Sequence, residues 1–231
     1  MRKKKALTLF LCVVLVTVAS VFGTLAFLTD TDEAVNTFTF GQVYIAVNEA
    51  KVNLMGQPLD EAGNTVANVS DASRVKSNNY RLVPGHTYVK DPTLTVFKGS
   101  EESYVRMLIT INKLSELDAI FASYGGADLL SIFGGYNPEK WIYAGETRED
   151  NAITYEFRYV DTVTPGADTD LILEPVFSSF TLPGEITDED LQTLYANSES
   201  LQISVVGNAI QASGFADEDS AWSAFDKQES N

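Results

Sequence analysis

Apolar residues recur at every second position in several stretches of this chain. That spacing is typical of β-strands with one buried face. The clearest stretch is 104–111, whose residues on the expected inner face are Val105, Met107, Ile109 and Ile111. Similar alternation occurs at 87–97, 153–159, 171–182 and 201–212, with turn-forming Pro and Gly residues between the stretches. We therefore expect roughly seven or eight short strands in an all-β fold, an antiparallel β-sandwich of two sheets.

The alternation nearest the N-terminus changes phase once. Phe38 and Phe40 occupy even positions. The apolar residues that follow occupy odd positions: Val43, Ile45 and Val47. A slip of one residue beside a glycine, here Gly41, indicates a β-bulge that keeps both sets on the core side of one strand. The alternative is two short strands joined by a turn.

Helical spacing replaces alternation in three places. Between 113 and 133 the apolar residues are three or four positions apart: Leu114, Leu117, Ile120, Phe121 and Tyr124. Thr187 precedes three acidic residues, which favours a helix whose N-terminus the threonine caps. A short terminal helix is expected at about 217–225, with a frayed tail at 226–231. The β fold should therefore carry short helical insertions.

The first 26 residues have the pattern of a secretory signal peptide. Four basic residues are followed by the uncharged apolar run Ala6–Phe22. Thr24 and Ala26 are small residues placed for cleavage between Ala26 and Phe27. The alternative is a retained membrane anchor, since the uncharged span Ala6–Leu28 is long enough to cross a bilayer. In either case we expect residues 27–231 to form a single domain outside the membrane.

Charge and cysteine content narrow the classes of partner. The chain carries 16 basic and 32 acidic residues, and removal of residues 1–26 takes four basic residues, so the mature charge is 12 − 32 = −20. Such acidity argues against nucleic acid as a partner, because phosphates would be repelled. The only cysteine, Cys12, lies in the predicted signal. A secreted domain without disulfides must be held together by its core.

No arrangement of residues predicts a catalytic centre. His86 is the only histidine and follows a Pro-Gly turn, so neither a zinc site nor a Ser-His-Asp triad has its usual ligands or partners. Paired carboxylates for glycoside cleavage stay open, because the sequence gives no separation between acids. We expect no catalytic residue, no cofactor and no bound metal.

Three acidic clusters raise the question of calcium binding. They are Asp30/Asp32/Glu33, Asp188/Glu189/Asp190 and Asp217/Glu218/Asp219. None has the spacing of a calcium-binding loop. For the second and third clusters, capping of helix N-termini is the better interpretation.

Aromatic residues offer two further interpretations. They are Trp141, Tyr143, Tyr155, Tyr159 and Trp222. Such residues could line a sugar-binding face, but they more often form the core or cover a sheet.

Two segments near the N-terminus resemble a known family. These segments, 23–30 and 36–43, read GTLAFLTD and NTFTFGQV, and they are similar to members of the TasA/camelysin family, which the signal peptidase SipW processes. Weaker similarity to distant members lies at 82–92, 104–106 and 209–222. The resemblance implies a jelly-roll sandwich, secretion, and residence in the extracellular biofilm matrix or at the cell surface.

The resemblance also implies a way of assembling. TasA-like subunits join by donor-strand exchange, in which the mature N-terminal strand of one copy completes the sheet of the next. In this chain the donor strand would contain Phe38, Phe40, Val43, Ile45 and Val47. Partners would be further copies or other matrix proteins, a SipW-type peptidase during export, and the membrane only through an uncleaved signal. The alternative is that this strand folds back into its own sheet.

Two other functions stay open beside a non-enzymatic structural subunit. Camelysin has been described as a metalloprotease, but this sequence lacks a recognisable set of metal ligands, so we do not expect that activity. The other alternative is a monomeric surface module that binds glycan or protein.

Overall fold

The structure, a computed structural model, describes residues 42–126, 128–195 and 200–229. The chain divides into two compact units, Met1–Phe40 and Gly41–Asn231, and the first lies outside the described residues. The predicted signal peptide and its cleavage site at Ala26 and Phe27 therefore lie outside them too. Among the described residues, no helix is long and apolar enough to cross a membrane.

The largest sheet has four antiparallel strands in the order β11-β5-β8-β7. Their bounds are β5 Ser103–Asn112, β7 Trp141–Glu149, β8 Ala152–Tyr159 and β11 Ile203–Gln211. In β5 the odd-numbered apolar residues are buried, as the alternation predicts, because successive side chains point to opposite faces of the sheet. The strand β7 was not expected from the sequence.

Two smaller antiparallel sheets complete the β structure. One has the order β2-β1-β4-β9, with bounds β1 Ile45–Ala50, β2 Arg74–Val75, β4 Thr93–Val96 and β9 Leu171–Ile172. The other has the order β3-β10-β6, with bounds β3 Thr87–Val89, β6 Phe133–Gly134 and β10 Ser179–Thr181. The stretch 171–182 was expected as one strand and is instead two short strands, β9 and β10, in different sheets. In the stretch 87–97, Pro92 indicates that the first part is an edge or precedes the strand proper, and that part is β3, an edge strand of another sheet.

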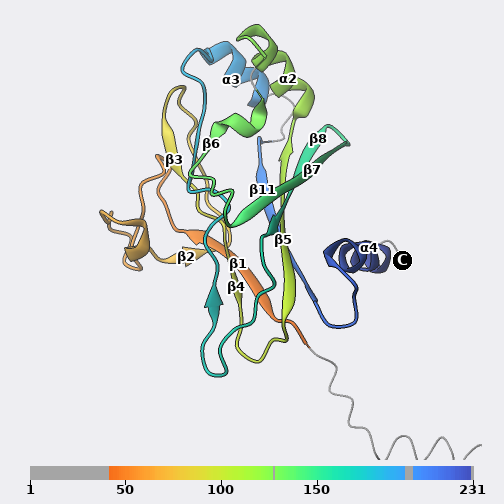
Figure 1. Cartoon of the computed structure of the whole chain (residues 1–231). Helices are drawn as coiled ribbons and strands as arrows, with labels where there is room; N and C mark the ends of the chain where they lie inside the picture. Colours follow the sequence, from red (N-terminus) through yellow and green to blue (C-terminus); the bar gives the residue numbers. More distant parts are fainter. Residues whose placement is uncertain (1–41, 127, 196–199, 230–231) are drawn as a thin grey trace, which may run out of the picture. The chain divides into compact units, whose positions relative to one another are not determined.

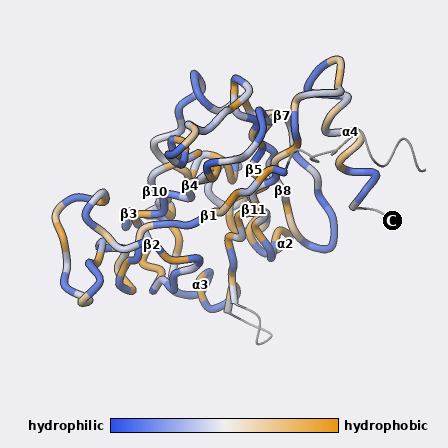
Figure 2. Tube along the Cα trace, turned by 90° about the horizontal axis from the view of Figure 1, so that it is seen from below, coloured by the Kyte–Doolittle hydropathy of each residue, from blue (hydrophilic) through white to orange (hydrophobic). Residues whose placement is uncertain are grey.

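The sheet of β1 and β4 packs against the sheet of β11 and β5 (Figure 1). The two sheets approach closely at Gly207: if this glycine carried a Cβ atom, that atom would lie 2.6 Å from Val47 Cγ2 and 2.8 Å from Leu94 Cδ1. In Figure 2 several central strands carry hydrophobic stretches, whereas peripheral loops are largely hydrophilic. The prediction of a mostly β, antiparallel fold is confirmed.

The helical elements match most of the expectations. The insert contains α2 Leu114–Ser123 and the 3-10 helix η2 Leu129–Ile132; the other helices are η1 Val69–Asp71, α3 Asp188–Tyr195 and α4 Glu218–Glu229. The predicted tail at 226–231 is wrong in part, because α4 continues through Asp226 to Glu229. The reason is an ion pair between Asp226 and Arg106 of β5, at 2.5 Å, which holds this turn against the sheet.

A two-residue turn joins β7 to β8 and also begins α2. Asp150 and Asn151 both have positive φ, 49° and 58°, as a tight type I′ hairpin turn requires. Asn151 then accepts two hydrogen bonds from the start of α2, from Leu114 N to its carbonyl oxygen (2.9 Å) and from Ser115 N to its side chain (2.7 Å). The hairpin therefore supplies the cap that α2 does not have in its own sequence.

Candidate functional site

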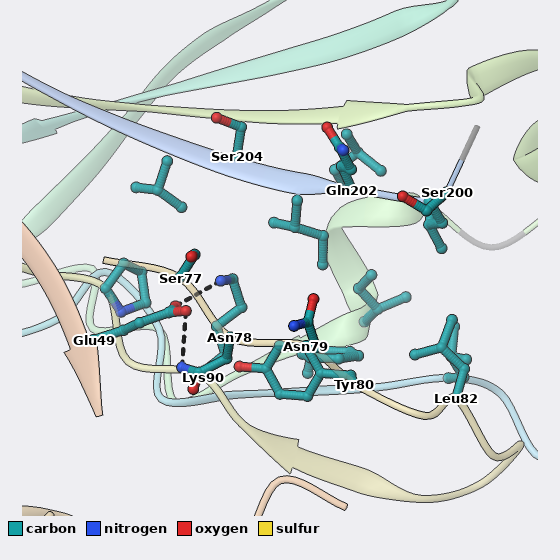
Figure 3. Close-up of a pocket in the computed structure, with 18 of the residues that line it drawn as sticks. Glu49, Ser77, Asn78, Asn79, Tyr80, Leu82, Lys90, Ser200, Gln202 and Ser204 are labelled. Atoms are coloured by element: carbon teal, nitrogen blue, oxygen red, sulfur yellow. Dashed lines mark hydrogen bonds and ion pairs between the residues drawn. The ribbon is translucent and has the colours of Figure 1, made fainter. Parts of the chain in front are cut away.

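A cleft of about 550 Å³ opens between β1 and the start of β11, and we call it the edge cleft (Figure 3). One wall is formed by 200–205 and the other by 47–49 together with 76–80. Its floor belongs to the core: Ile111, Leu117, Phe121, Leu129, Ile132, Phe180 and Leu182. The edge cleft thus gives access to the interior between the packed sheets.

The strand β11 has an unpaired edge. Asn112 N donates to Gln202 O at 3.3 Å, and Ala212 N donates to Glu102 O at 2.8 Å, so even-numbered residues of β11 face β5. Backbone groups alternate between the two edges of an antiparallel strand. The N–H and C=O groups of Ile203 and Val205 therefore point away from β5, and no described strand pairs with that edge.

The same reasoning shows that, within the described part of the chain, one edge of β1 is also unpaired over most of its length. Phe97 N donates to Tyr44 O at 2.9 Å, which places even-numbered residues of β1 toward β4. The backbone groups of Ile45 and Val47 consequently point to the other side. There β2 pairs only with the last two residues of β1, and the chain after β2 diverges to line the edge cleft.

The exposed edge of β11 has none of the features that normally protect a sheet edge. Natural proteins guard edge strands with charged side chains, proline or bulges. At the opposite edge of this sheet, β7 carries Glu146, Arg148 and Glu149 and has a register shift between Tyr143 and Gly145. The segment 200–213 contains no charged residue and no proline. The two edges of one sheet thus differ in their protection.

Apolar residues along both walls are incompletely buried. Val47, Ile203 and Val205 pack against the core yet keep part of their surface exposed. By contrast, Ile109 and Leu94, which lie farther from this opening in the same two sheets, are fully buried. The core is therefore incomplete along the edge cleft, and an apolar strand or ligand that fills the cleft would bury more of this surface.

One end of the edge cleft is polar. The Glu49 carboxylate receives hydrogen bonds from Lys90 Nζ (2.6 Å) and Asn78 Nδ2 (2.9 Å), and Glu49 and Lys90 are almost fully buried. The ring of Tyr80 lies 5.9 Å from Lys90 Nζ. Burial, together with the negative charges of Glu49 and Asp91, raises the pKa of the Tyr80 hydroxyl, so it stays protonated. No sequence pattern predicted this cluster.

The structure places part of the predicted donor strand in the chain's own sheet. Ile45 and Val47 lie in β1 and pair with Val96 and Leu94 of β4. Val43 is half-buried just before β1. Phe38 and Phe40, with the predicted bulge at Gly41, lie outside the described residues. The C-terminal part of the predicted donor strand, Ile45 and Val47, is therefore folded back into the chain's own sheet, which was the alternative to donation.

The candidate residues for chemistry have structural roles. His86 Nε2 lies 2.9 Å from Met55 O, and its ring packs edge-on against Tyr88. Asp190 exchanges hydrogen bonds with Thr187, and Asp217 Oδ1 accepts from Ser220 N at 2.8 Å, so the second and third acidic clusters cap helices as predicted. The cluster at 30–33 lies outside the described residues. Among the described residues, no group of three or more His, Cys, Asp or Glu is placed to hold a metal.

The aromatic residues mostly pack in the core, as the commoner of their two interpretations expects. Trp141, Tyr155 and Trp222 are buried, and Tyr143 alone of the five is exposed. A smaller cavity of about 320 Å³ lies near η2 and β6, with a mostly apolar lining that includes Phe133, Phe157 and Phe177. The interpretation as a sugar-binding face is therefore wrong for these residues, whose role is packing.

Neither a family model, nor a curated protein, nor a solved structure matches this chain.

Proposed function

We propose that this protein is a secreted, non-enzymatic structural subunit of an extracellular matrix or cell-surface fibre, with a jelly-roll sandwich as its body. Copies join when an apolar strand of one copy adds to the free edge of β11 in the next and fills the edge cleft. This is recognition by strand addition, in which backbone hydrogen bonds supply affinity and side-chain pockets supply specificity.

The observation that carries the proposal is the uncharged, unpaired edge of β11 beside an opening into the core. An incoming strand would find the backbone groups of Ile203 and Val205 as hydrogen-bond partners. Its apolar side chains would cover the half-buried Val47 and the floor of the cleft. The opposite edge of this sheet, on β7, carries charged side chains, so strand addition is directed to the β11 side.

The donor is the part of the predicted N-terminal donor strand that precedes β1. Because Ile45 and Val47 already pair with β4, we assign donation to the segment that contains Phe38 and Phe40. Burial of one such side chain contributes about 1.5–3 kcal/mol, so two phenylalanines and their backbone hydrogen bonds could hold a joint. Cleavage of the signal would be required first, since the donor lies directly behind it.

The test uses proline on the two edges of the same sheet. The mature chain, 27–231, should form filaments visible by electron microscopy. Val205→Pro removes an N–H that points to the free edge and leaves the ladder to β5 intact, so filaments should be lost while the fold is kept. The matched control is Arg148→Pro, which removes an outward N–H from the guarded edge of β7, and its filaments should persist.

Circular dichroism and thermal melting of both variants establish that each is folded. Filaments of Val205→Pro as abundant as those of the unmodified chain would contradict the proposal, and so would a mature chain that stays monomeric at high concentration. Casein clearing that a chelator abolishes would point instead to a secreted metalloprotease. Retention on polysaccharide by a monomer would point to a surface-binding module.

A further inference from the structure

Three side chains of complementary chemistry meet at the polar end of the edge cleft. Glu49 lies near the end of β1, Asn78 in the loop after β2, and Lys90 directly after β3. One oxygen of the Glu49 carboxylate accepts from Lys90 Nζ at 2.6 Å, and the other accepts from Asn78 Nδ2 at 2.9 Å. Figure 3 shows both nitrogen atoms directed at this one carboxylate. An amine, an amide and a carboxylate are therefore held in one cluster.

We propose that Lys90 and Asn78 become joined by an intramolecular amide bond, with Glu49 as the proton carrier. Glu49 takes a proton from the Lys90 ammonium, and the neutral Nζ attacks Asn78 Cγ. The Nζ–Cγ bond forms, the Cγ–Nδ2 bond breaks, and Glu49 returns the proton to the departing nitrogen, which leaves as ammonia. Nζ loses a second proton as the new amide forms, and the ammonia takes up this proton and departs as ammonium, so Glu49 ends as a carboxylate and the charge balances. No oxidant, reductant or other reactant is needed.

The hydrogen bonds around Asn78 orient its amide for this reaction. Val52 N donates to Asn78 Oδ1 at 2.9 Å, where negative charge develops when the amine attacks. Asn78 Nδ2 donates to Ala50 O at 2.8 Å as well as to Glu49. The opposite orientation of the amide would set two donors against each other, so these partners fix which side carries the leaving nitrogen.

Burial favours the amine over water as the nucleophile. Glu49 is 4 % exposed and Lys90 6 % exposed, and Asn78 is half-buried. Nζ must approach the amide carbon to about 3–3.5 Å, which the flexible stem of lysine allows. The neighbouring pair, Arg74 with Asp91, also has an amide beside it, since Arg74 Nε donates to Asn48 Oδ1 at 3.0 Å. A guanidinium stays protonated and is no nucleophile, so this pair serves as an ordinary ion pair for comparison.

The bond would fix one wall of the edge cleft. It would close the loop from Asn78 to Lys90, which includes the cleft-lining residues Asn79, Tyr80 and Leu82. The mature chain has no cysteine, so a covalent link of this kind would take the place of a disulfide. The inference stands on the Glu49 cluster alone and does not depend on how copies assemble.

Peptide mapping of the folded, full-length protein tests the bond. Trypsin cuts after Lys and Arg, so an unlinked chain gives separate peptides 77–81, 82–90 and 91–98. The linked chain should give 77–81 attached to an uncut 82–98, with a mass lower than their sum by one ammonia molecule. This linked pair should account for most of the material from protein that has folded.

Four variants identify the reacting groups. Asn78→Ala and Lys90→Arg should abolish the linked pair, and Glu49→Gln should abolish or greatly slow its formation, because glutamine cannot accept the proton. Asn79→Ala, a neighbour in the same peptide, should leave the link intact. Loss of the link should lower the melting temperature of Asn78→Ala by roughly 5–10 °C relative to Asn79→Ala.

Two results would overturn the inference. One is a folded wild-type protein whose Lys90 is cut by trypsin and whose Asn78 is unmodified, which would make the cluster an ordinary buried ion pair. The other is aspartate at position 78 with an unlinked Lys90, which would show that water reaches the amide before the amine does.

Discussion

Single side chains determine how α3 begins. Thr187 and Asp190 form a reciprocal cap: Asp190 Oδ2 accepts from Thr187 N at 2.8 Å, and Thr187 Oγ1 accepts from Asp190 N at 3.2 Å. Tyr124 of the neighbouring helical insert also donates to Asp190, at 2.6 Å. The hydrogen bonds from Thr187 and then from Tyr124 lower the pKa of the Asp190 carboxyl.

Replacement of Asp190 by Asn should therefore lower the free energy of unfolding by an amount that depends on pH. A carboxyl whose pKa is lowered by folding stabilises the protein above its unfolded pKa, and that stability is lost as the pH falls through the folded pKa. The Asp190→Asn variant should be less stable than wild type at pH 7, and the difference should shrink below about pH 4. Urea unfolding at several pH values measures it.

Glu189→Gln, in the same turn, is the control for Asp190→Asn, because no hydrogen bond from a described residue to its carboxylate supports α3. The loss of stability in Glu189→Gln should depend on pH much less than the loss in Asp190→Asn. If the loss of unfolding free energy in Asp190→Asn stayed constant from pH 7 to pH 3, the charge of Asp190 would contribute nothing to the cap.

The cap of α3 was predictable from the sequence, whereas the Glu49 cluster was not. Thr187 and Asp190 are three residues apart, so local helix geometry brings them together. Lys90 and Glu49 meet only because the tertiary fold brings together β1, β3 and the loop after β2, and β1 and β3 belong to different sheets. Alternating hydrophobicity shows which face of a strand is buried, but it does not show which strands are neighbours.

At the scale of elements, a buried arginine makes several of the contacts that hold α4 to the outer face of the large sheet. Arg106 of β5 is 5 % exposed, and its guanidinium carbon lies 4.5 Å from the ring centre of Trp222 and 5.2 Å from that of Phe225. It also donates to Asp226 at 2.5 Å and to Asn208 of β11 at 3.2 Å. One side chain thus combines cation–π contacts with a charged hydrogen bond.

Removal of this side chain should release α4. Arg106→Ala should lower the free energy of unfolding by about 2–4 kcal/mol, the sum expected for such contacts. Trp222 should become exposed, so the fluorescence emission should move to longer wavelength, and a Trp222→Phe background should remove that change. Arg148→Ala, on the half-exposed edge of β7, should alter stability by no more than about 0.5 kcal/mol. An unchanged Trp222 emission in Arg106→Ala would contradict this role.

The strands differ in how clearly the hydrophobic periodicity of the sequence predicts them. The strand β5 is buried on one face along its whole length, so its alternation is complete. The strand β7 buries Trp141 at its start and is mostly exposed beyond, so polar residues occupy both faces and the period of two is lost. Pro92 lies between β3 and β4. The stretch 171–182 likewise contains two short strands, β9 and β10. Edge strands and short strands are therefore the elements that sequence periodicity misses.

At the scale of the whole molecule, charge opposes any close approach of two copies. The full chain has a net charge of −16, and the chain without residues 1–26 has −20. Copies with this charge repel one another over a distance that salt shortens, to about 8 Å at physiological ionic strength. The uncharged strand β11 is where an approaching copy meets no acidic side chain on the strand itself.

Salt should therefore accelerate assembly. Elongation of the mature chain, followed by light scattering, should be several-fold faster in 0.15 M than in 0.01 M sodium chloride, since the screening length falls from about 30 Å to about 8 Å. Val205→Pro should not elongate at either concentration. Elongation that slows with added salt would indicate that opposite charges, and not an apolar strand, bring copies together.

Under the proposed assembly, the position of α4 would limit the directions in which copies can add. Arg158 of β8 and Arg106 of β5 both bind acidic residues of α4, which therefore lies across the solvent face of the large sheet (Figure 1). A second sheet cannot stack on a face that a helix already covers, so lamination of the amyloid kind is blocked there. If copies add along the border of β11 as proposed, we expect a thread one molecule wide that does not thicken into a plaque.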